Sequence, residues 1–238
     1  MRRMIIGAAV VGLVCVSALA WGQDVEELLR EGKDYRNNCR YEKSIECYTR
    51  AIELNPECAL AYSGRAGNYF ALGRFDEAVA DYTTAIELDP EPEVAYYNRG
   101  LALEALGRYD EAMADFTTYI EIAPDIEETY LSRANVSLQQ GDLDAALEDI
   151  NTALAQRPDF AHALSFRADI YREQGRLLEA LADIETAMDI WPGQSWYYYT
   201  RGKVYRDLGN MDQARNDFDM ACYSGVEEAC DELEKLGK

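Results

Sequence analysis

Apolar side chains between Ala59 and Pro90 recur every three or four residues, which is the spacing of one face of an α-helix. They are Tyr62, Ala66 and Tyr69, followed after Gly73 by Phe75, Ala78, Tyr82, Ala85, Ile86 and Leu88. Proline lacks a backbone N–H and clashes with a continuing helix, so Pro90 ends the second run. The pattern therefore predicts two helices joined by a turn at Gly73.

This pattern returns every 34 residues, six times, with no insertion or deletion. The copies begin at Val25, Ala59, Glu93, Glu127, Ala161 and Ser195. A glycine marks the turn in five of them, and Cys39 stands there in the first; the glycines are Gly73, Gly107, Gly141, Gly175 and Gly209. Such a period predicts a solenoid, an architecture whose usual function is binding rather than catalysis.

The eighth place of every copy holds glycine or alanine, which lets two helix backbones approach closely. Large residues such as Tyr82 and Phe116 would fill the space between neighbouring helices. The segment AYSGRAGNYFALGRFDEAVADYTTAIELDP resembles the tetratricopeptide repeat, and the resemblance extends over nearly all of the chain after its N-terminal segment. It implies an all-α, right-handed superhelical solenoid of six helix-turn-helix units with a C-terminal capping helix.

The organisation expected from this resemblance has eight segments. They are a signal peptide at 1–22, repeats at 25–58, 59–92, 93–126, 127–160, 161–194 and 195–228, and a cap at 229–238.

The N-terminal segment has the layout of a secretory signal peptide: Arg2 and Arg3, an apolar run from Met4 to Trp21, then polar sequence. Ala18-Leu19-Ala20 forms a small-residue cleavage site, and a cut after Gly22 fits as well. An uncleaved membrane anchor is the alternative, because the run approaches the ~20 residues that a spanning helix needs. We therefore expect an exported protein, periplasmic or secreted.

The net charge of −21 opposes binding to nucleic acid, because only five lysines are present and they are scattered. A solvated acidic surface that keeps the solenoid soluble is the simpler interpretation, and attraction of a basic partner is the alternative.

One arginine and one aspartate recur together, sixteen residues apart, in copies two to six. The arginines are Arg65, Arg99, Arg133, Arg167 and Arg201, and the aspartates are Asp81, Asp115, Asp149, Asp183 and Asp217. The first copy replaces both, with Glu31 and Cys47. Because a lone buried charge is costly, this joint replacement predicts an ion pair across each helical hairpin rather than a phosphate site.

The family resemblance also implies a concave groove lined by the second, fifth, ninth and twelfth places of each copy. The residues predicted to bind protein there are Phe70, Val94, Tyr97, Leu101, Leu131, Leu138, Trp196 and Tyr199. An exposed apolar patch with aromatic anchors is typical of a binding surface. The alternative is a tightly curled solenoid in which some of these side chains pack against each other.

Towards the C-terminal end the same places are polar and mixed in charge, with His162, Ser165, Asp169, Arg172, Lys203 and Arg206. The Lys, Asn and Arg clamp by which some family members hold acidic chaperone tails is absent, because its places hold Ser63, Gly64 and Gly67.

Five cysteines follow the signal segment: Cys39, Cys47, Cys58, Cys222 and Cys230. The segment CYSGVEEAC resembles the cysteine pair of Sel1-like repeats, which implies a disulfide between Cys222 and Cys230 in an oxidising compartment. Pairing among the other three stays open, and an odd number leaves one thiol over.

The sequence offers no catalytic, cofactor or metal motif, and His162 is its only histidine. We expect no enzyme and no cofactor. The favoured function is an exported interaction scaffold or assembly factor that binds a peptide or helix of another exported or envelope protein, without nucleic-acid or membrane binding after cleavage. A self-associating structural solenoid of the cell envelope is the alternative, although Asp231, Glu232 and Glu234 favour a polar cap.

Overall fold

The structure is a computed structural model of the chain, and it describes residues 24–89 and 93–237. The expected signal peptide at 1–22, its cleavage site and Pro90 lie outside these residues. None of the helices in the described part of the chain combines the length and apolar character needed to cross a membrane.

The described residues form thirteen helices and no strand, so the predicted all-α fold is confirmed. The first helix, α1, covers residues 24–37. The others are α2 (Tyr41–Leu54), α3 (Ala59–Ala71), α4 (Phe75–Leu88), α5 (Glu93–Ala105), α6 (Tyr109–Ile122), α7 (Glu127–Gln140), α8 (Leu143–Gln156), α9 (Ala161–Glu173), α10 (Leu177–Ile190), α11 (Ser195–Asp207), α12 (Met211–Tyr223) and α13 (Glu227–Leu236).

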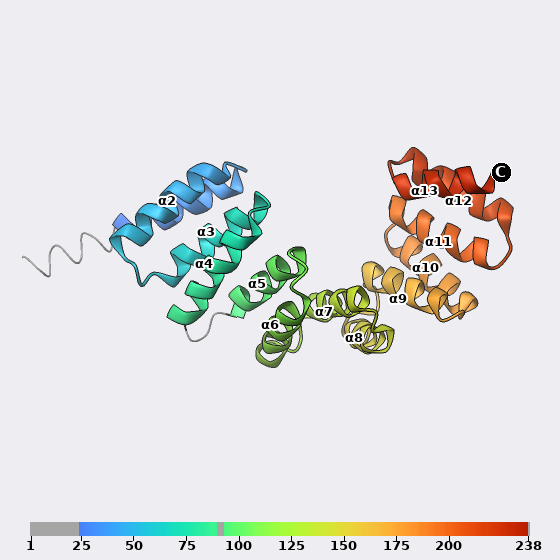
Figure 1. The fold of residues 1–238 in the computed structure, drawn as a ribbon, viewed down its shortest axis with the longest axis horizontal. Helices are drawn as coiled ribbons and strands as arrows, with labels where there is room; N and C mark the ends of the chain where they lie inside the picture. Colours follow the sequence, from blue (N-terminus) through green and yellow to red (C-terminus); the bar gives the residue numbers. More distant parts are fainter. Residues whose placement is uncertain (1–23, 90–92, 238) are drawn as a thin grey trace, which may run out of the picture. The chain divides into compact units, whose positions relative to one another are not determined.

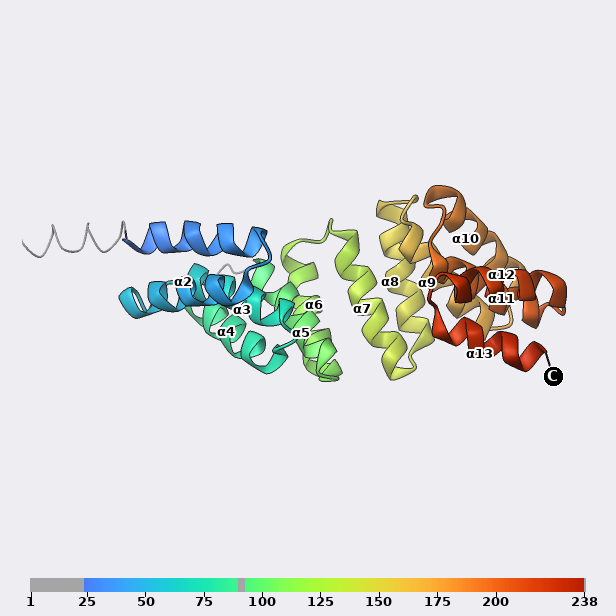
Figure 2. The same ribbon diagram turned by 90° about the horizontal axis from the view of Figure 1, so that it is seen from above.

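Consecutive helices pack as antiparallel hairpins, which are seen most clearly for α7 with α8 in Figure 2. The first helix of copies two to six begins at the residue that opens the copy, while α13 begins at Glu227, within the last copy. The turns need a left-handed residue, and Gly141 supplies it with φ 80°. Cys39 adopts the same region with φ 56°, where its Cβ is crowded.

The chain divides into two compact units, each drawn in Figure 1. Unit 1 ends at Ile122 and contains α1 to α6; unit 2 begins at Ala123 and contains α7 to α13. Each has its own core. In unit 1, Tyr48 and Tyr82 lie in the core and Phe116 is completely buried, and in unit 2 Ile150, Ile184 and Phe218 are completely buried.

Small residues at the eighth place seat the large residues of the second helix, as predicted. A Cβ added to Gly100 would lie 2.8 Å from the Phe116 ring, and one added to Gly202 would lie 2.7 Å from the Phe218 ring. Real Cβ atoms essentially never make so short a contact, so the phenylalanine rings fit in these two hairpins because Gly100 and Gly202 have no side chain.

Candidate functional site

The recurring arginine and aspartate form bidentate ion pairs in all five copies that carry them. Arg99 Nε donates to Asp115 Oδ2 at 2.7 Å, and its Nη2 donates to Oδ1 at 2.8 Å. The same two bonds join Arg65 to Asp81, Arg133 to Asp149, Arg167 to Asp183 and Arg201 to Asp217. The hydrogen bond to Asp115 raises the pKa of Arg99. These arginines hold the hairpins together, as predicted, and are not a phosphate site.

The first copy has a single, longer contact between the same two places. The Cys47 thiol donates to Glu31 Oε2 at 4.0 Å. Burial, followed by the nearby Glu31 charge, raises the pKa of the Cys47 thiol, so it stays protonated at neutral pH. Both partners have changed, yet the two places still meet.

Arg65, Arg99 and Arg167 also donate to the second helix of the preceding copy, a contact that sequence reasoning missed. Arg99 Nη1 reaches Thr83 Oγ1 at 3.0 Å, and Arg65 and Arg167 reach Thr49 and Asn151 at 3.1 and 2.9 Å. Each acceptor lies sixteen residues before its arginine, and this recurrence was the available signal. These arginines therefore link three helices and two copies.

In unit 1 the predicted groove residues lie on α3 and α5, which contact each other. Val94 is 60% exposed, while Phe70, Tyr97 and Leu101 are half-buried. Phe70 packs edge-on against Phe75, with ring centroids 5.4 Å apart. These side chains therefore pack partly against neighbouring residues and keep part of their apolar surface exposed.

Tyr97 shows this double character best, because its ring lies against the second helix of its own copy. Its centroid is 5.8 Å from that of Phe116 and 5.5 Å from that of Tyr119. The ring is therefore held in place by α6 while part of it remains open to solvent. A rigid, half-buried aromatic ring costs little entropy to order on binding.

Arg36 is a groove residue that the sequence analysis did not predict; it stands at the twelfth place of the first copy, and Lys33 stands at the ninth. The Arg36 guanidinium lies on α3 beside Gly67: a Cβ added there would be 3.0 Å from Nη1. It is exposed, and it makes no ion pair within the described residues. Applying the same register to the first copy would have found it.

In unit 2 the expected exposure of Leu131 is wrong. Leu131 is only 9% exposed, because it packs into the core cluster that contains Ala134 and Ile150. Leu138 packs half-buried against that cluster. The apolar character of these two places on α7 therefore belongs largely to the core.

At the far end of unit 2, Trp196 and Tyr199 lie side by side on α11, with ring centroids 5.0 Å apart. The Lys203 ammonium lies 4.8 Å from the Tyr199 centroid and 2.6 Å from Asp169 Oδ1. Trp196 is 42% exposed. This aromatic pair thus borders a cation whose charge Asp169 already balances.

The other groove charges of unit 2 are paired as well. Arg172 Nη1 donates to Asp207 Oδ2 at 3.0 Å. Arg206 donates to Asp207 through Nε at 3.1 Å and to Glu232 through Nη1. The polar end predicted from the sequence is therefore a network of internal ion pairs.

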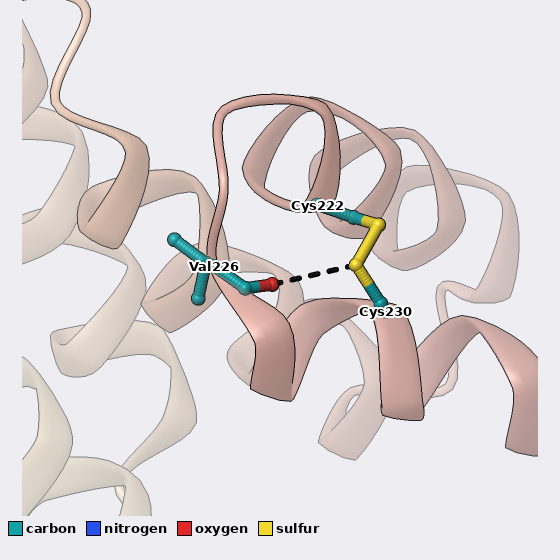
Figure 3. Close-up of a disulfide and its surroundings, with 3 residues drawn as sticks. All are labelled: Cys222, Val226 and Cys230. Atoms are coloured by element: carbon teal, nitrogen blue, oxygen red, sulfur yellow. Dashed lines mark hydrogen bonds between the residues drawn. A yellow bond between two sulfur atoms is a disulfide. The ribbon is translucent and has the colours of Figure 1, made fainter.

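The C-terminal hairpin brings the two predicted cysteines together, as Figure 3 shows. The sulfur atoms of Cys222 on α12 and Cys230 on α13 lie 1.96 Å apart, and their Cα atoms 4.9 Å apart. Cys230 Sγ lies 3.6 Å from the carbonyl oxygen of Val226, the N-cap residue of α13. Cys39, Cys47 and Cys58 are unbridged.

His162 lies beside a pocket of about 440 Å³ in unit 2. Its ring stacks on Trp191 at 5.1 Å between centroids, and Arg157 lies 3.7 Å from the Phe160 centroid in the same pocket. Arg157 is paired with Glu127 and Glu128, both at 2.9 Å. No group of three metal-ligating side chains occurs in residues 24–89 and 93–237.

Comparisons with known proteins agree with this architecture. Models described as "Tetratricopeptide repeat" match residues 29–91, 68–125, 131–195 and 197–223. The sequence has no match among curated proteins.

Several solved structures share the fold. A tetratricopeptide repeat protein from Parabacteroides merdae ATCC 43184 is 25% identical, with a TM-score of 0.70 over 90% of this chain and 84% of that one. PilW, described as a widely conserved type IV pilus biogenesis factor, is 22% identical, with a TM-score of 0.77 over 90% and 98%. YrrB, described as having an unusual peptide-binding site, is 23% identical, with a TM-score of 0.61 over 80% and 99%. Because the family models cover most of the sequence, the chain belongs to the tetratricopeptide repeat family.

Proposed function

We propose that this protein is an exported scaffold or assembly factor, and that the groove of unit 1 binds a peptide or helix of another exported or envelope protein. The observation that carries the proposal is the apolar surface on α3 and α5. Val94 is 60% exposed there, beside the half-buried side chains of Phe70, Tyr97 and Leu101. Exposed apolar side chains next to fixed aromatic rings are typical of protein-binding sites.

The shape of α3 supports access to this surface. Ser63, at the fifth place of the second copy, is a small side chain that keeps part of its surface exposed, whereas Gly67, at the ninth place, is buried beneath the Arg36 guanidinium. The apolar side chains of a partner can reach Phe70 and Tyr97, which are both half-buried. The aromatic pair Trp196 and Tyr199 lies in unit 2 beside Lys203, which is already paired with Asp169, and it is not part of the proposed site.

The similar proteins support the same class of function. PilW is described as a pilus biogenesis factor and YrrB as a peptide-binding protein. An assembly role in the cell envelope would fit the N-terminal segment, with cleavage after Ala20 or Gly22 and an uncleaved anchor as the alternative. A disulfide between Cys222 and Cys230 would form in such an oxidising compartment.

The test uses the mature chain from residue 23 and peptides selected against it from a displayed library of random 12-residue sequences. Replacing Tyr97 with alanine should weaken binding of a selected peptide by on the order of 30-fold, or ~2 kcal/mol, as loss of an anchor does. The matched control is Tyr199→Ala, which removes a tyrosine from the same place of the last copy, where it packs 6.0 Å from Phe218. The control should change affinity little.

Thermal unfolding of both variants separates binding from packing. Tyr97 contacts Phe116 and Tyr119, so some loss of stability is expected from either role. An unstable Tyr97→Ala protein with unchanged affinity would move this residue to the core and refute the proposed site. Failure to select any peptide would refute the binding function itself.

A further inference from the structure

Three arginines occupy the twelfth place of a copy: Arg36, Arg172 and Arg206. Two of them are neutralised inside unit 2. Arg172 pairs with Asp207 at 3.0 Å, and Arg206 bonds to Asp207 and Glu232. Arg36, in unit 1, has no carboxylate partner among the described residues. Arg40, Arg50 and Arg215 also have no ion pair within the described residues, but of these four arginines only Arg36 stands at a groove place.

One residue position accounts for the difference in pairing between Arg172 and Arg36. Asp207, the partner of Arg172, is the last residue of α11 and belongs to the copy after that of Arg172. The corresponding residue after Arg36 is Ala71, the last residue of α3, and it is exposed. The first two copies therefore contain the arginine but lack an acidic residue at position 71 that would pair with it.

Gly67 provides the seat for this arginine. A Cβ added to Gly67 would be 3.0 Å from Nη1 and 3.2 Å from Cζ of Arg36. The guanidinium therefore lies against the backbone of α3 at the ninth place, which is a groove place, while Arg36 remains exposed. Phe70 stands one turn further along the same helix, so charge and apolar surface adjoin.

Two phenol groups add polarity at this end of unit 1. The place that holds Phe116, Ile150, Ile184 and Phe218 in other copies, all of them 0% exposed, holds Tyr48 and Tyr82 in the first two copies. Both tyrosines keep a little surface, 6% and 3%. Burial raises the pKa of Tyr82 to about 12, and the positive charge of Arg36 opposes that rise. Both phenols remain protonated at neutral pH, as hydrogen-bond donors.

We propose that Arg36, seated on Gly67, binds a carboxylate of the partner peptide at the N-terminal end of the unit 1 groove. The inference rests on the proposed function, because it names the chemistry of one end of the same ligand. The guanidinium can offer two parallel N–H donors to a carboxylate, as Arg99 does for Asp115. The ligand is thus a peptide with an acidic group next to apolar residues, and the acid is either a side chain or the terminal carboxylate.

The net charge of −21 makes this selectivity unusual. The field of the whole chain repels acidic peptides and attracts basic ones. If the bound peptide prefers an acidic group at one fixed position, that preference must come from a local positive charge, because the overall charge of the protein would oppose it. Raising the salt concentration weakens the long-range repulsion and the exposed local contact together, so affinities should be compared at one ionic strength.

The experiment measures affinities of three synthetic forms of a library-selected peptide: the parent, a form with Asp or Glu changed to Asn or Gln, and a form amidated at its C-terminus. Losing the bound carboxylate should weaken binding about tenfold or more. The form that loses affinity identifies the carboxylate as a side chain or as the terminus.

Two variants test the assignment to Arg36. Arg36→Gln removes the charge, and Ala71→Asp supplies the internal partner that Asp207 provides to Arg172. Both positions are exposed, so the fold should persist, and thermal unfolding checks this. Either change should remove the preference for the acidic peptide, while the matched control Ala71→Asn keeps it.

The outcomes separate this inference from the function on which it rests. If acidic and neutral peptides bind equally, or if the preference survives Arg36→Gln, the carboxylate subsite is wrong, while loss of binding in Tyr97→Ala still upholds the groove. If no peptide binds the mature chain, both proposals fall.

Discussion

Unit 1 and unit 2 use the same hairpin and the same arginine–aspartate pair, but they treat the charges of their grooves differently. In unit 2 Arg172 and Arg206 are held by Asp207 and Glu232, and Lys203 is held by Asp169. In unit 1 the corresponding Arg36 is exposed and has no ion pair with any residue of 24–89 or 93–237.

The comparison shows two kinds of position in each copy. Arg99 and Asp115, with their equivalents, link helices and must stay paired, because breaking a buried pair is costly. The groove places tolerate either an internal partner or none, so they can change without loss of the fold. Repeats of one architecture can therefore present a closed surface at one end of the chain and an open one at the other.

The largest expected loss of stability comes from breaking an arginine–aspartate pair, a feature that both units contain. Arg99→Ala should lower the free energy of unfolding by about 3 kcal/mol, because it leaves Asp115, 5% exposed, without its partner. Adding Asp115→Ala should cost less than the sum of the single changes. Urea unfolding followed by circular dichroism measures the cycle, and strictly additive losses would mean that the pair is not energetically coupled.

A matched control uses an exposed pair in the same unit. Arg74 donates to Glu77 at 2.9 Å, and the two side chains are 47% and 48% exposed. Solvent screens such a pair, so Arg74→Ala should leave the unfolding midpoint almost unchanged. A loss as large as that of Arg99→Ala would show that burial is not what distinguishes the two arginines.

The next effect distinguishes the units. A disulfide between Cys222 and Cys230 would close a short loop in unit 2 alone and should add roughly 2–3 kcal/mol. The double change Cys222→Ser with Cys230→Ser should lower the stability of unit 2 by that amount and make it insensitive to reductant. Non-reducing peptide mapping should find the two cysteines linked in protein from an oxidising compartment. Free thiols at both positions would disprove the bridge.

A smaller effect on stability should distinguish the paired Arg172 from the unpaired Arg36. Arg172→Gln removes the contact to Asp207 and should cost about 1–2 kcal/mol, because a charged hydrogen bond is lost and the side chain is only 18% exposed. Arg36→Gln should leave the unfolding midpoint unchanged. Equal losses in urea unfolding would mean that Arg36 has a structural role instead.

Much of this fold could be predicted from the sequence, because periodic apolar positions and the turn glycines specify each hairpin locally. The arginine–aspartate pairs were predictable for a different reason: both members change together in the first copy, as Glu31 and Cys47. Repetition within one chain thus reveals contacts that a single copy would hide.

The groove was harder to predict, because exposure depends on how successive helices pack. Leu131 stands at a groove place and yet is buried, since the core cluster with Ile150 reaches it. The pair between copies was equally hard to predict. Arg172 and Asp207 lie 35 residues apart, and this combination of arginine and aspartate does not recur in other copies. Contacts that occur once leave no periodic signal.

The central claim is that a peptide binds the open groove of unit 1 and not the closed end of unit 2. The most direct measurement is photo-crosslinking of a selected peptide that carries benzophenone groups at its apolar positions, with the linked residues located by mass spectrometry. The account predicts cross-links to α1, α3 and α5, around Arg36, Phe70 and Tyr97. Cross-links concentrated on α9 and α11, around Asp169 and Tyr199, would contradict it.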